Sequence, residues 1–256
     1  MAKWPLHRFF YKQPEFREYL PPTALFNRET LRAFLSQYPE VYIKANLEHA
    51  GRGIIKVWKH GEGYEFVKIR GRKTCADSID QLYAKLRAVI KPGVRHVIQK
   101  GIDLAEVDGR RYDIRVMMMR NGKGKWEYTG MVAKVAGPGS VITNVGRGRG
   151  YAVEIERALR NSAFDKAADI EKLKRELVDL SYRISSRCDQ FRYTPELGID
   201  YGIDRNGRIW IIEINFDYPS HALFNKLKDK TMYQKIRATA SAYRSWKKQR
   251  GRKNSH

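Results

Sequence analysis

Residues 196–215 read ELGIDYGIDRNGRIWIIEIN and have the pattern of a β-hairpin. Asn206-Gly207 between two apolar runs predicts a two-residue type I′ turn, because both residues tolerate positive φ angles. Counting outward from that turn places Asp200 opposite Glu213. Residues that face each other in an antiparallel pair point to the same side, with Cβ atoms about 5 Å apart. The hairpin is therefore predicted to bring two carboxylates together.

Strand alternation extends this pattern to the neighbouring residues of the hairpin. It puts the Asn215 carboxamide on the face of the two carboxylates. It sends Trp210, Ile212 and Ile214 to the other face as an apolar layer. Two unpaired carboxylates at this distance repel, and a divalent cation removes the repulsion. Oxygen ligands with room for water and phosphates suit Mg²⁺, whereas the alternative is a solvent-facing hairpin whose acids pair with Lys and Arg.

The composition limits the class of protein and the kind of partner. A chain of 256 residues suggests one domain or two joined lobes. Its 50 Lys and Arg against 28 Asp and Glu give a net charge of +22, which predicts an anionic partner such as nucleic acid, a nucleotide triphosphate, an acidic peptide or an anionic surface. Because there is no run of about 18 apolar residues and no secretory signal pattern, we expect no membrane span and a cytoplasmic location. Cys75 and Cys188 lack a C-x-x-C spacing and indicate neither a zinc site nor a disulfide framework.

A glycine-containing loop separates two predicted strands, 41–45 and 54–58, near the start of the chain. Gly51 and Gly53 lie between strands, unlike the glycines of a Walker P-loop, which open a helix. Their backbone N–H groups could bind a phosphate chain, and an ordinary turn is the alternative. Residues 1–22 are basic, aromatic and interrupted by proline, and predict an arm laid over the body or recruited by a partner.

The rest of the chain alternates predicted strands and helices. Apolar side chains at helical spacing predict helices at 27–37, 77–90, most of 151–190, and 231–248. Further strands are expected at 64–70, 96–102, 112–120 and 126–135. Residues 136–150, AGPGSVITNVGRGRG, indicate either a mobile loop or an RNA-binding Gly-Arg element, and residues 247–256 a frayed basic tail.

Seven stretches in a fixed order resemble the ATP-grasp superfamily and, within it, the YheC/YheD-like endospore coat-associated branch. They are YIKA followed by GRGII, VIQKGI, YDIRV, RNGKGKW, TGMVAKVAGPGS, TN, and ELGID followed by GRIWIIEIN. The resemblance implies an α+β ATP-grasp fold, in which two α+β lobes with mainly antiparallel sheets grip ATP, here without a full N-terminal pre-ATP-grasp domain. The expected boundaries are an arm at 1–22, a small lobe with the glycine loop at 23–104, a large lobe with the metal hairpin at 105–246, and a basic tail at 247–256.

The resemblance also implies a role for each residue that matches a family motif. It implies ATP contacts by Lys44, Gly51 and Gly53 at the phosphates, by Gln99, Lys100 and Ile102 at the hinge beside adenine, and by Asp113 at the ribose. It implies that Arg115 and Lys134 face the triphosphate or acylphosphate as catalytic residues. It implies Mg²⁺ ligands at Asp200, Glu213 and Asn215, and contacts with the carboxylate substrate from Asn144, Arg147 and Arg149.

The activity implied by the resemblance is an ATP- and Mg²⁺-dependent carboxylate–amine ligase. A carboxylate oxygen would attack the γ-phosphorus to give an acylphosphate, which an amine then converts to an amide. We expect an amino acid, peptide or protein carboxylate, and an acceptor site completed by a partner chain, a second copy or a large substrate. The alternative is a non-catalytic basic protein that binds nucleic acid or another polyanion on an ATP-grasp scaffold, and a third hypothesis is a phosphotransferase.

Overall fold

The computed structural model describes residues 2–48, 52–69, 71–143, 145–146, 148–160, 166–216 and 218–253. The chain forms two compact units, one of Met1–Asp103 with Ala136–Gly150 and the other of Leu104–Val135 with Tyr151–His256. Each unit is an α+β structure built on an antiparallel sheet. The sequence predicted a single boundary after residue 104, whereas segment 136–150 packs with the first unit.

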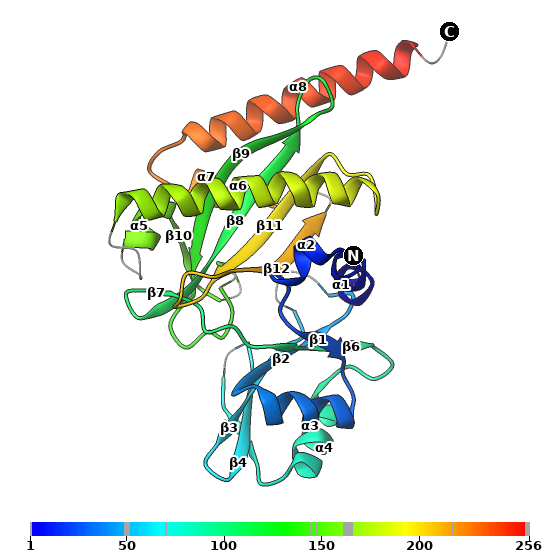
Figure 1. Ribbon diagram of the computed structural model, residues 1–256, viewed down its shortest axis with the longest axis vertical. Helices are drawn as coiled ribbons and strands as arrows, with labels where there is room; N and C mark the ends of the chain where they lie inside the picture. Colours follow the sequence, from blue (N-terminus) through cyan, green and yellow to red (C-terminus); the bar gives the residue numbers. More distant parts are fainter. Residues whose placement is uncertain are drawn as a thin grey trace. The chain divides into compact units, whose positions relative to one another are not determined.

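The first unit is built on a six-stranded sheet with the strand order β1-β6-β2-β3-β4-β5. Its elements in chain order are α1 (Lys3–Tyr11), α2 (Pro14–Arg17), β1 (Thr23–Leu25), α3 (Arg28–Gln37), β2 (Glu40–Ala45), β3 (Ile54–His60), β4 (Gly63–Lys68), β5 (Thr74–Ala76), α4 (Ile79–Val89) and β6 (His96–Lys100). Figure 1 shows α3 and α4 on the same side of this sheet.

Helices α3 and α4 supply the core of the first unit. Helix α3 begins at a capping box, in which the Asn27 side chain accepts from Thr30 N and the Thr30 hydroxyl accepts from Asn27 N. Its apolar face packs with that of α4 and with alternate strand residues, in a cluster that includes Leu31, Leu35, Val41, Ile43, Leu82, Leu86 and Ile98. Strand β2 buries every second residue. Its other side chains, including Lys44, therefore point away from this helical layer.

The predicted N-terminal arm is two short helices that pack on the first unit. Leu6, Phe10 and Phe16 are buried, and the rings of Phe10 and Phe16 meet edge to face at 5.1 Å. Trp4 N donates to Asn46 Oδ1 at 2.8 Å. Burial of these three apolar side chains makes the segment part of the folded first unit.

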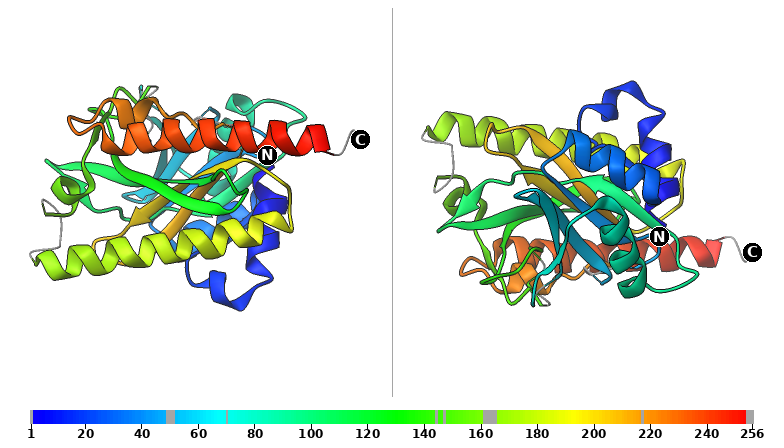
Figure 2. Two further views of the ribbon diagram at one scale, coloured as in Figure 1. Left: turned by 90° about the horizontal axis from the view of Figure 1, so that it is seen from above. Right: turned by 90° about the horizontal axis from the view of Figure 1, so that it is seen from below.

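The second unit is built on a sheet with the order β10-β9-β8-β11-β12, and β7 adds to β8. Its elements are β7 (Glu106–Val107), β8 (Arg110–Arg120), β9 (Trp126–Val135), β10 (Tyr151–Val153), α5 (Ile155–Arg160), α6 (Ala167–Asp189), β11 (Glu196–Ile203), β12 (Ile209–Phe216), α7 (Ala222–Asn225) and α8 (Thr231–Lys253). Figure 2 shows α6 and α8 on opposite faces of these strands.

Different helices pack on the two faces of the second sheet. On one face the Tyr201 and Ser181 hydroxyls meet at 2.8 Å, which joins β11 to α6. On the other face Met117 and Met119 pack with Ile236 of α8 and Phe224 of α7. Because strand side chains alternate, Asp113 and Arg115 lie on the same face as Met117. Asp113 and Arg115 therefore lie on the sheet face that α7 and α8 cover around Met117 and Met119.

Helix α8 is longer than the sequence predicted. The expected frayed tail begins at residue 247, but the helix continues to Lys253. Among the residues that the structure describes, no helix is long and apolar enough to cross a membrane.

Candidate functional site

The β11–β12 hairpin brings Asp200 opposite Glu213, as the sequence predicted, but through a different loop. The predicted two-residue type I′ turn is wrong. Gly207 N donates to Asp204 O at 2.9 Å and Asp204 N to Arg208 O at 3.1 Å, so the loop consists of residues 205–207. Only Gly207 in this loop has a positive φ, of 81°. This is the three-residue hairpin loop that ends in a left-handed glycine.

A β-bulge restores the predicted register. Near the loop Tyr201 pairs with Ile211, and beyond the register shift Asp200 pairs with Glu213, so Ile212 is the extra residue. The three-residue loop shifts the strand pairing by one residue relative to a two-residue turn, and the bulge shifts it back by one. Asp200 therefore pairs with Glu213, as in the count from the two-residue turn. The prediction for Trp210 is wrong, because Trp210 pairs with Gly202 and so shares the face of Asp200.

Ile212 also departs from the predicted apolar layer. A Cβ added at Gly202, on the Asp200 face, would lie 3.0 Å from Ile212 Cδ1. Ile214 pairs with Ile199 and keeps the predicted orientation, away from Asp200. An extra residue in one strand changes the alternation of side chains, and the sequence count assumed a regular ladder.

Charged side chains form a continuous network across three strands of the second sheet, β9, β8 and β11. Arg115 and Asp200 are paired across β8 and β11, and Asp113 and Lys134 across β8 and β9. Arg115 donates to Asp200 twice, from Nε to Oδ1 at 2.5 Å and from Nη2 to Oδ2 at 2.9 Å. Lys134 Nζ lies 2.9 Å from both Asp113 Oδ1 and Asp200 Oδ1. Strands distant in sequence thus assemble a charge network, which we call the β8–β11 charge cluster.

The cluster is buried and its charges stabilise each other. Asp113, Arg115, Lys134 and Asp200 are each no more than 8% exposed. Burial alone would raise the pKa of Asp200, but the charges of Arg115 and Lys134, with their hydrogen bonds, lower it to about 2. Burial opposes the charge of Arg115, yet the facing Asp200 carboxylate raises the pKa of the guanidinium. Asp200 and Arg115 are therefore held ionised.

The predicted magnesium ligands fit a cation that arrives with phosphates. Asn215 Nδ2 donates to Asp200 Oδ2 at 3.2 Å, which places the carboxamide beside the carboxylate. Among the described residues no group of three His, Cys, Asp or Glu could hold a metal ion. Two carboxylates and one carboxamide match the sparse protein coordination of Mg²⁺, whose other ligands are water and substrate phosphate oxygens. The donor atoms are of the kind that Mg²⁺ takes, and the assignment of Asp200, Glu213 and Asn215 as its ligands stays a prediction.

Asp200 of the hairpin is buried and ion-paired. The alternative interpretation expected the acids to pair with Lys and Arg, and Asp200 is paired with Arg115 and Lys134. It also expected a solvent-facing hairpin, whereas Asp200 is buried. Asp113, Asp200 and Glu213 carry three negative charges against two positive charges on Arg115 and Lys134. The remaining charge of −1 favours a cation at this face, and the positive groups beside it suit the oxygens of a phosphate chain.

In the first unit, Lys44 lies on the sheet face opposite to α3 and α4. Its Nζ donates to Gln99 Oε1 at 2.6 Å, and Gln99 Nε2 donates to Thr23 Oγ1 at 2.9 Å. Tyr42 is paired with Gln99 across β2 and β6, so it shares their face. The structure thus brings two predicted ATP contacts together and fixes the lysine ammonium at the centre of the sheet.

The remaining predicted contacts of the first unit have separate positions. Gly53 has a φ of 63°, and a Cβ there would lie 3.2 Å from Ala45 Cβ, so the turn into β3 requires glycine. Lys100 ends β6 with its Nζ 5.5 Å from the Tyr38 ring centroid, and Ile102 is buried. Arg149 is exposed with a φ of 50° and belongs to segment 136–150. Gly51, Asn144 and Arg147 lie outside the described residues.

A histidine–glutamate pair lies on the same face as the charge cluster and was not predicted. His221 Nε2 is 2.7 Å from Glu196 Oε2, and the Glu196 side chain is only 4% exposed. Between them and Asp200, a Cβ on Gly198 would lie 2.7 Å from Pro219 and 3.1 Å from Arg115 Nη1. The segment after β12 therefore folds back over β11 beside Arg115. His221 follows Asn215 closely in sequence, but only the fold reveals its buried partner.

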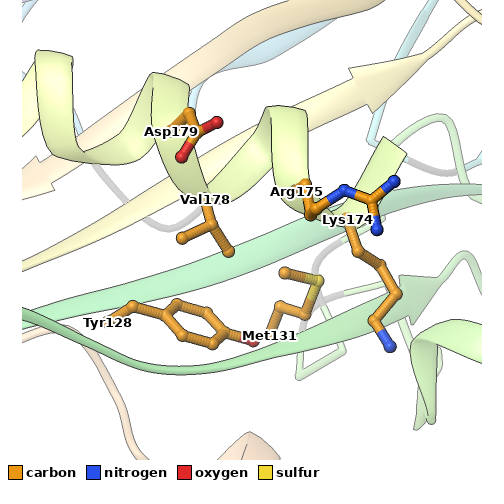
Figure 3. Close-up of a pocket in the computed structure, with 6 residues that line it drawn as sticks. All are labelled: Tyr128, Met131, Lys174, Arg175, Val178 and Asp179. Carbon is orange, nitrogen blue, oxygen red and sulfur yellow. The ribbon is translucent and has the colours of Figure 1, made fainter. Parts of the chain in front are cut away.

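A separate pocket of about 230 Å³ lies between α6 and β9. It is lined by Tyr128, Met131, Lys174, Arg175, Val178 and Asp179. Figure 3 shows Val178 of α6 pointing toward Tyr128 and Met131 on the strand below. Met131 pairs with Val116, on the sheet face opposite to Arg115, and the pocket includes none of the predicted site residues.

Comparison with known proteins identifies the family. The profile of the YheC/D like ATP-grasp family matches residues 1–246. The chain belongs to this family. Two of its curated relatives are from Bacillus subtilis: the endospore coat-associated protein YheD is 28% identical over 230 residues, and YheC is 25% identical over 226 residues. These alignments cover 87% and 83% of this chain but 49% and 58% of the relatives, so the chain spans about half of their length.

One solved structure that matches this chain is N5-carboxyaminoimidazole ribonucleotide synthetase from Thermotoga maritima. It is 16% identical, has a TM-score of 0.45, and matches 93% of this chain and 48% of the enzyme. Membership in this ATP-grasp family indicates ATP binding and ATP-dependent ligase chemistry. The predicted α+β class and family are confirmed.

Proposed function

We propose that this chain is an ATP- and Mg²⁺-dependent carboxylate–amine ligase that forms an amide or peptide bond through an acylphosphate. The observation that carries the proposal is the β8–β11 charge cluster beside Glu213 and Asn215. The buried cluster together with the half-buried Glu213 has a formal net charge of −1, which is suited to a magnesium ion that brings phosphates with it. Family membership supports the same chemistry.

Each side chain of the cluster has a role that follows from its charge and position. Asp200, Glu213 and Asn215 would hold Mg²⁺, which offsets phosphate charge when bound. Arg115 and Lys134 would each bind Asp200 and the transferred phosphoryl group at the same time. Both donate to Asp200 Oδ1, and both have further N–H groups that could donate to phosphate oxygens. Asp113 keeps the Lys134 ammonium in place. No protein nucleophile is required, because the substrate carboxylate attacks phosphorus.

Lys44 and the residues around it would bind the nucleotide from the first unit. Lys44 carries a positive charge on the helix-free face, where the Gln99 carboxamide orients it. An ammonium group at this position suits the phosphates, as a point charge that need not bind in a fork geometry. We propose the backbone of Gln99, Lys100 and Ile102 for adenine, and an amino acid, peptide or protein as the carboxylate substrate.

Nucleotide binding tests the first half of the proposal. Isothermal titration calorimetry with ATP should give saturable binding that depends on Mg²⁺. Glu213→Gln should weaken the Mg²⁺-dependent binding by about tenfold or more, because removing a charged ligand costs more than 1.4 kcal/mol. Glu176→Gln, an exposed glutamate on α6, is the matched control and should bind as the parent does. Absence of Mg²⁺-ATP binding in the parent protein would refute the proposal.

Turnover tests the second half. ADP release should be measured with ATP, Mg²⁺ and a panel of amino acids and peptides, with hydroxylamine as a small amine that traps acylphosphates as hydroxamates. A mass-spectrometric search should find an ATP-dependent mass gain on the substrate that corresponds to amide formation. A stable phosphorylated product without an amide would instead indicate a phosphotransferase.

A further inference from the structure

Four aromatic and two arginine side chains form a continuous row of contacts at one end of the second sheet. The Arg120 guanidinium lies 4.3 Å from the Trp126 ring centroid and 4.7 Å from that of Tyr193. The Tyr193 hydroxyl is hydrogen-bonded to that of Tyr243. The Tyr243 ring is 5.7 Å from Trp246, over which the Arg250 guanidinium lies at 5.1 Å. We call Trp126, Arg120, Tyr193, Tyr243, Trp246 and Arg250 the aromatic–arginine row.

Tertiary packing fixes the row at its centre. Arg120 is buried, donates to Thr194 O at 3.0 Å and to Gly124 O at 2.9 Å, and is ion-paired with Asp189. A Cβ on Gly124 would lie 2.5 Å from Trp246, so the β8–β9 turn touches α8 there. Figure 1 shows this turn beside α8. The row therefore joins β8, β9, the segment before β11 and α8 into one rigid surface.

The surface around the row is strongly positive. Lys123 and Lys125 flank Gly124 in the β8–β9 turn and are exposed. Lys247, Lys248 and Arg250 follow Trp246 on α8 and are also exposed. The sequence of α8, residues 231–253, contains no Asp or Glu. Asp189, an acid near the row, is ion-paired with Arg120 and accepts a hydrogen bond from Trp126 Nε1 at 3.1 Å. Its negative charge therefore offsets that of Arg120 and not that of the exposed lysines and Arg250.

The exposed rings favour a partner that carries bases as well as phosphates over a polyanion without rings. Tyr193 is 55% exposed, and Trp126 and Trp246 are half-buried, so ring surface is offered between cations. Bases of single-stranded nucleic acid stack on such rings, while Lys and Arg bind the phosphates between them. Residues 247–251, KKQRG, carry no large apolar side chain, which disfavours insertion into a lipid surface.

We propose that the aromatic–arginine row, with Lys123, Lys125, Lys247 and Lys248, is a binding surface for single-stranded nucleic acid. Phosphates lie along the lysines of the turn and of α8, and bases stack on Tyr193 and the tryptophans. The proposal is independent of the ligase function, because the surface uses none of the residues assigned to nucleotide or metal.

Fluorescence anisotropy with labelled oligonucleotides tests the charge component. The probes are oligothymidine of about 16 nucleotides, an abasic strand of equal length and a duplex of equal length. Lys247→Gln, Lys248→Gln and Arg250→Gln together should weaken oligothymidine binding by at least tenfold at about 0.1 M salt. The same triple variant should reduce the salt slope by about 2, since each single-strand phosphate contact contributes about 0.7. Lys59→Gln, Arg87→Gln and Lys91→Gln remove the same charge from exposed sites in the first unit and should change binding less than twofold.

Ring removal tests the stacking component. Tyr193→Ala should weaken oligothymidine binding by about fivefold to a hundredfold and leave binding of the abasic strand unchanged, because a stacked base contributes that range. Tyr193→Phe keeps the ring, loses the hydrogen bond to Tyr243 and should bind as the parent does. Circular dichroism and Mg²⁺-ATP titration verify that each variant is folded.

Three results would overturn the proposal. The first is equal loss in the two triple variants, which would indicate a general effect of net charge. The second is equal affinity for the abasic strand and oligothymidine in the parent protein, which would indicate a polyanion surface without base stacking. The third is tighter binding of the duplex than of oligothymidine.

Discussion

Asp200 and Glu213 lie opposite each other across β11 and β12, and a bulge at Ile212 compensates for the loop that precedes them. A hairpin with the same loop and no bulge would pair Asp200 with Ile212. One inserted residue therefore decides whether two carboxylates share a face or a carboxylate faces an isoleucine. The loop, the bulge and the acids form one unit, in which each part can be tested.

The geometry of the loop predicts that substitutions at Asn206 and Gly207 lower the free energy of unfolding by different amounts. Gly207→Ala should lower the free energy of unfolding by about 1 kcal/mol, because Gly207 has a φ of 81°. Asn206→Ala should cost less than about 0.5 kcal/mol, since Asn206 has no positive φ in this loop. Urea unfolding measures both variants. Equal costs at the two positions would instead favour the type I′ turn, which requires positive φ at both residues.

Removing the charge of Asp200 should destabilise the second unit. Asp200→Asn leaves Arg115 and Lys134 with less negative charge in a buried site, and should cost about 3–5 kcal/mol. The midpoint of urea unfolding measures this loss. Asp200→Asn combined with Arg115→Met should recover part of it, because the unpaired guanidinium is then absent. A double variant less stable than Asp200→Asn would contradict the explanation.

The His221–Glu196 pair predicts a similar effect at the edge of the site. His221→Ala removes the histidine that pairs with the buried Glu196 carboxylate and should lower the free energy of unfolding by about 1–3 kcal/mol, measured in urea. Addition of Glu196→Gln should restore stability, since a neutral amide is easier to bury than a carboxylate. The control is His60→Ala. His60 is 67% exposed and 3.8 Å from Glu65, so its loss should have almost no effect.

Stability should fall on mild acidification because of His7. Burial lowers the pKa of His7 to about 4, from an ordinary value of 6.5, while its ring stacks between Trp4 and Tyr11. Between pH 6.5 and 4 the unfolded chain binds more protons than the folded one, so this stabilisation is complete above pH 6.5 and is lost as the pH falls toward 4. The largest loss is about 3 kcal/mol.

Urea unfolding across this pH range measures the His7 effect, with His7→Phe as the comparison. The phenylalanine keeps an aromatic ring in the stack and cannot take up a proton, so the pH dependence should become shallower. Some dependence of the same sign should remain, because burial also lowers the pKa of His96. An unchanged pH profile in His7→Phe would rule out this origin.

The sequence by itself determined the features that local patterns encode. The hairpin count reached the Asp200–Glu213 pair only because the loop and the bulge, neither of which it predicted, shift the register in opposite directions. Apolar periodicity and the Asn27 cap predicted α3, and strand alternation predicted β2 and β3. These features depend on neighbours a few residues apart, whose spacing is fixed by the 3.6-residue helix or the two-residue strand repeat. The ordered motifs also predicted the family, which the profile match confirmed.

Only the tertiary structure decided which charges meet. Arg115 precedes Asp200 by 85 residues, yet β8 pairs with β11 and forms two hydrogen bonds between them. Tyr193 and Tyr243 likewise come from separate segments. Pairing of distant strands and packing of helices on a sheet depend on the whole fold, so no local period encodes them. The sequence therefore identified the carboxylates of the hairpin, and the fold supplied the cations that neutralise them and the row of rings that we propose for nucleic acid.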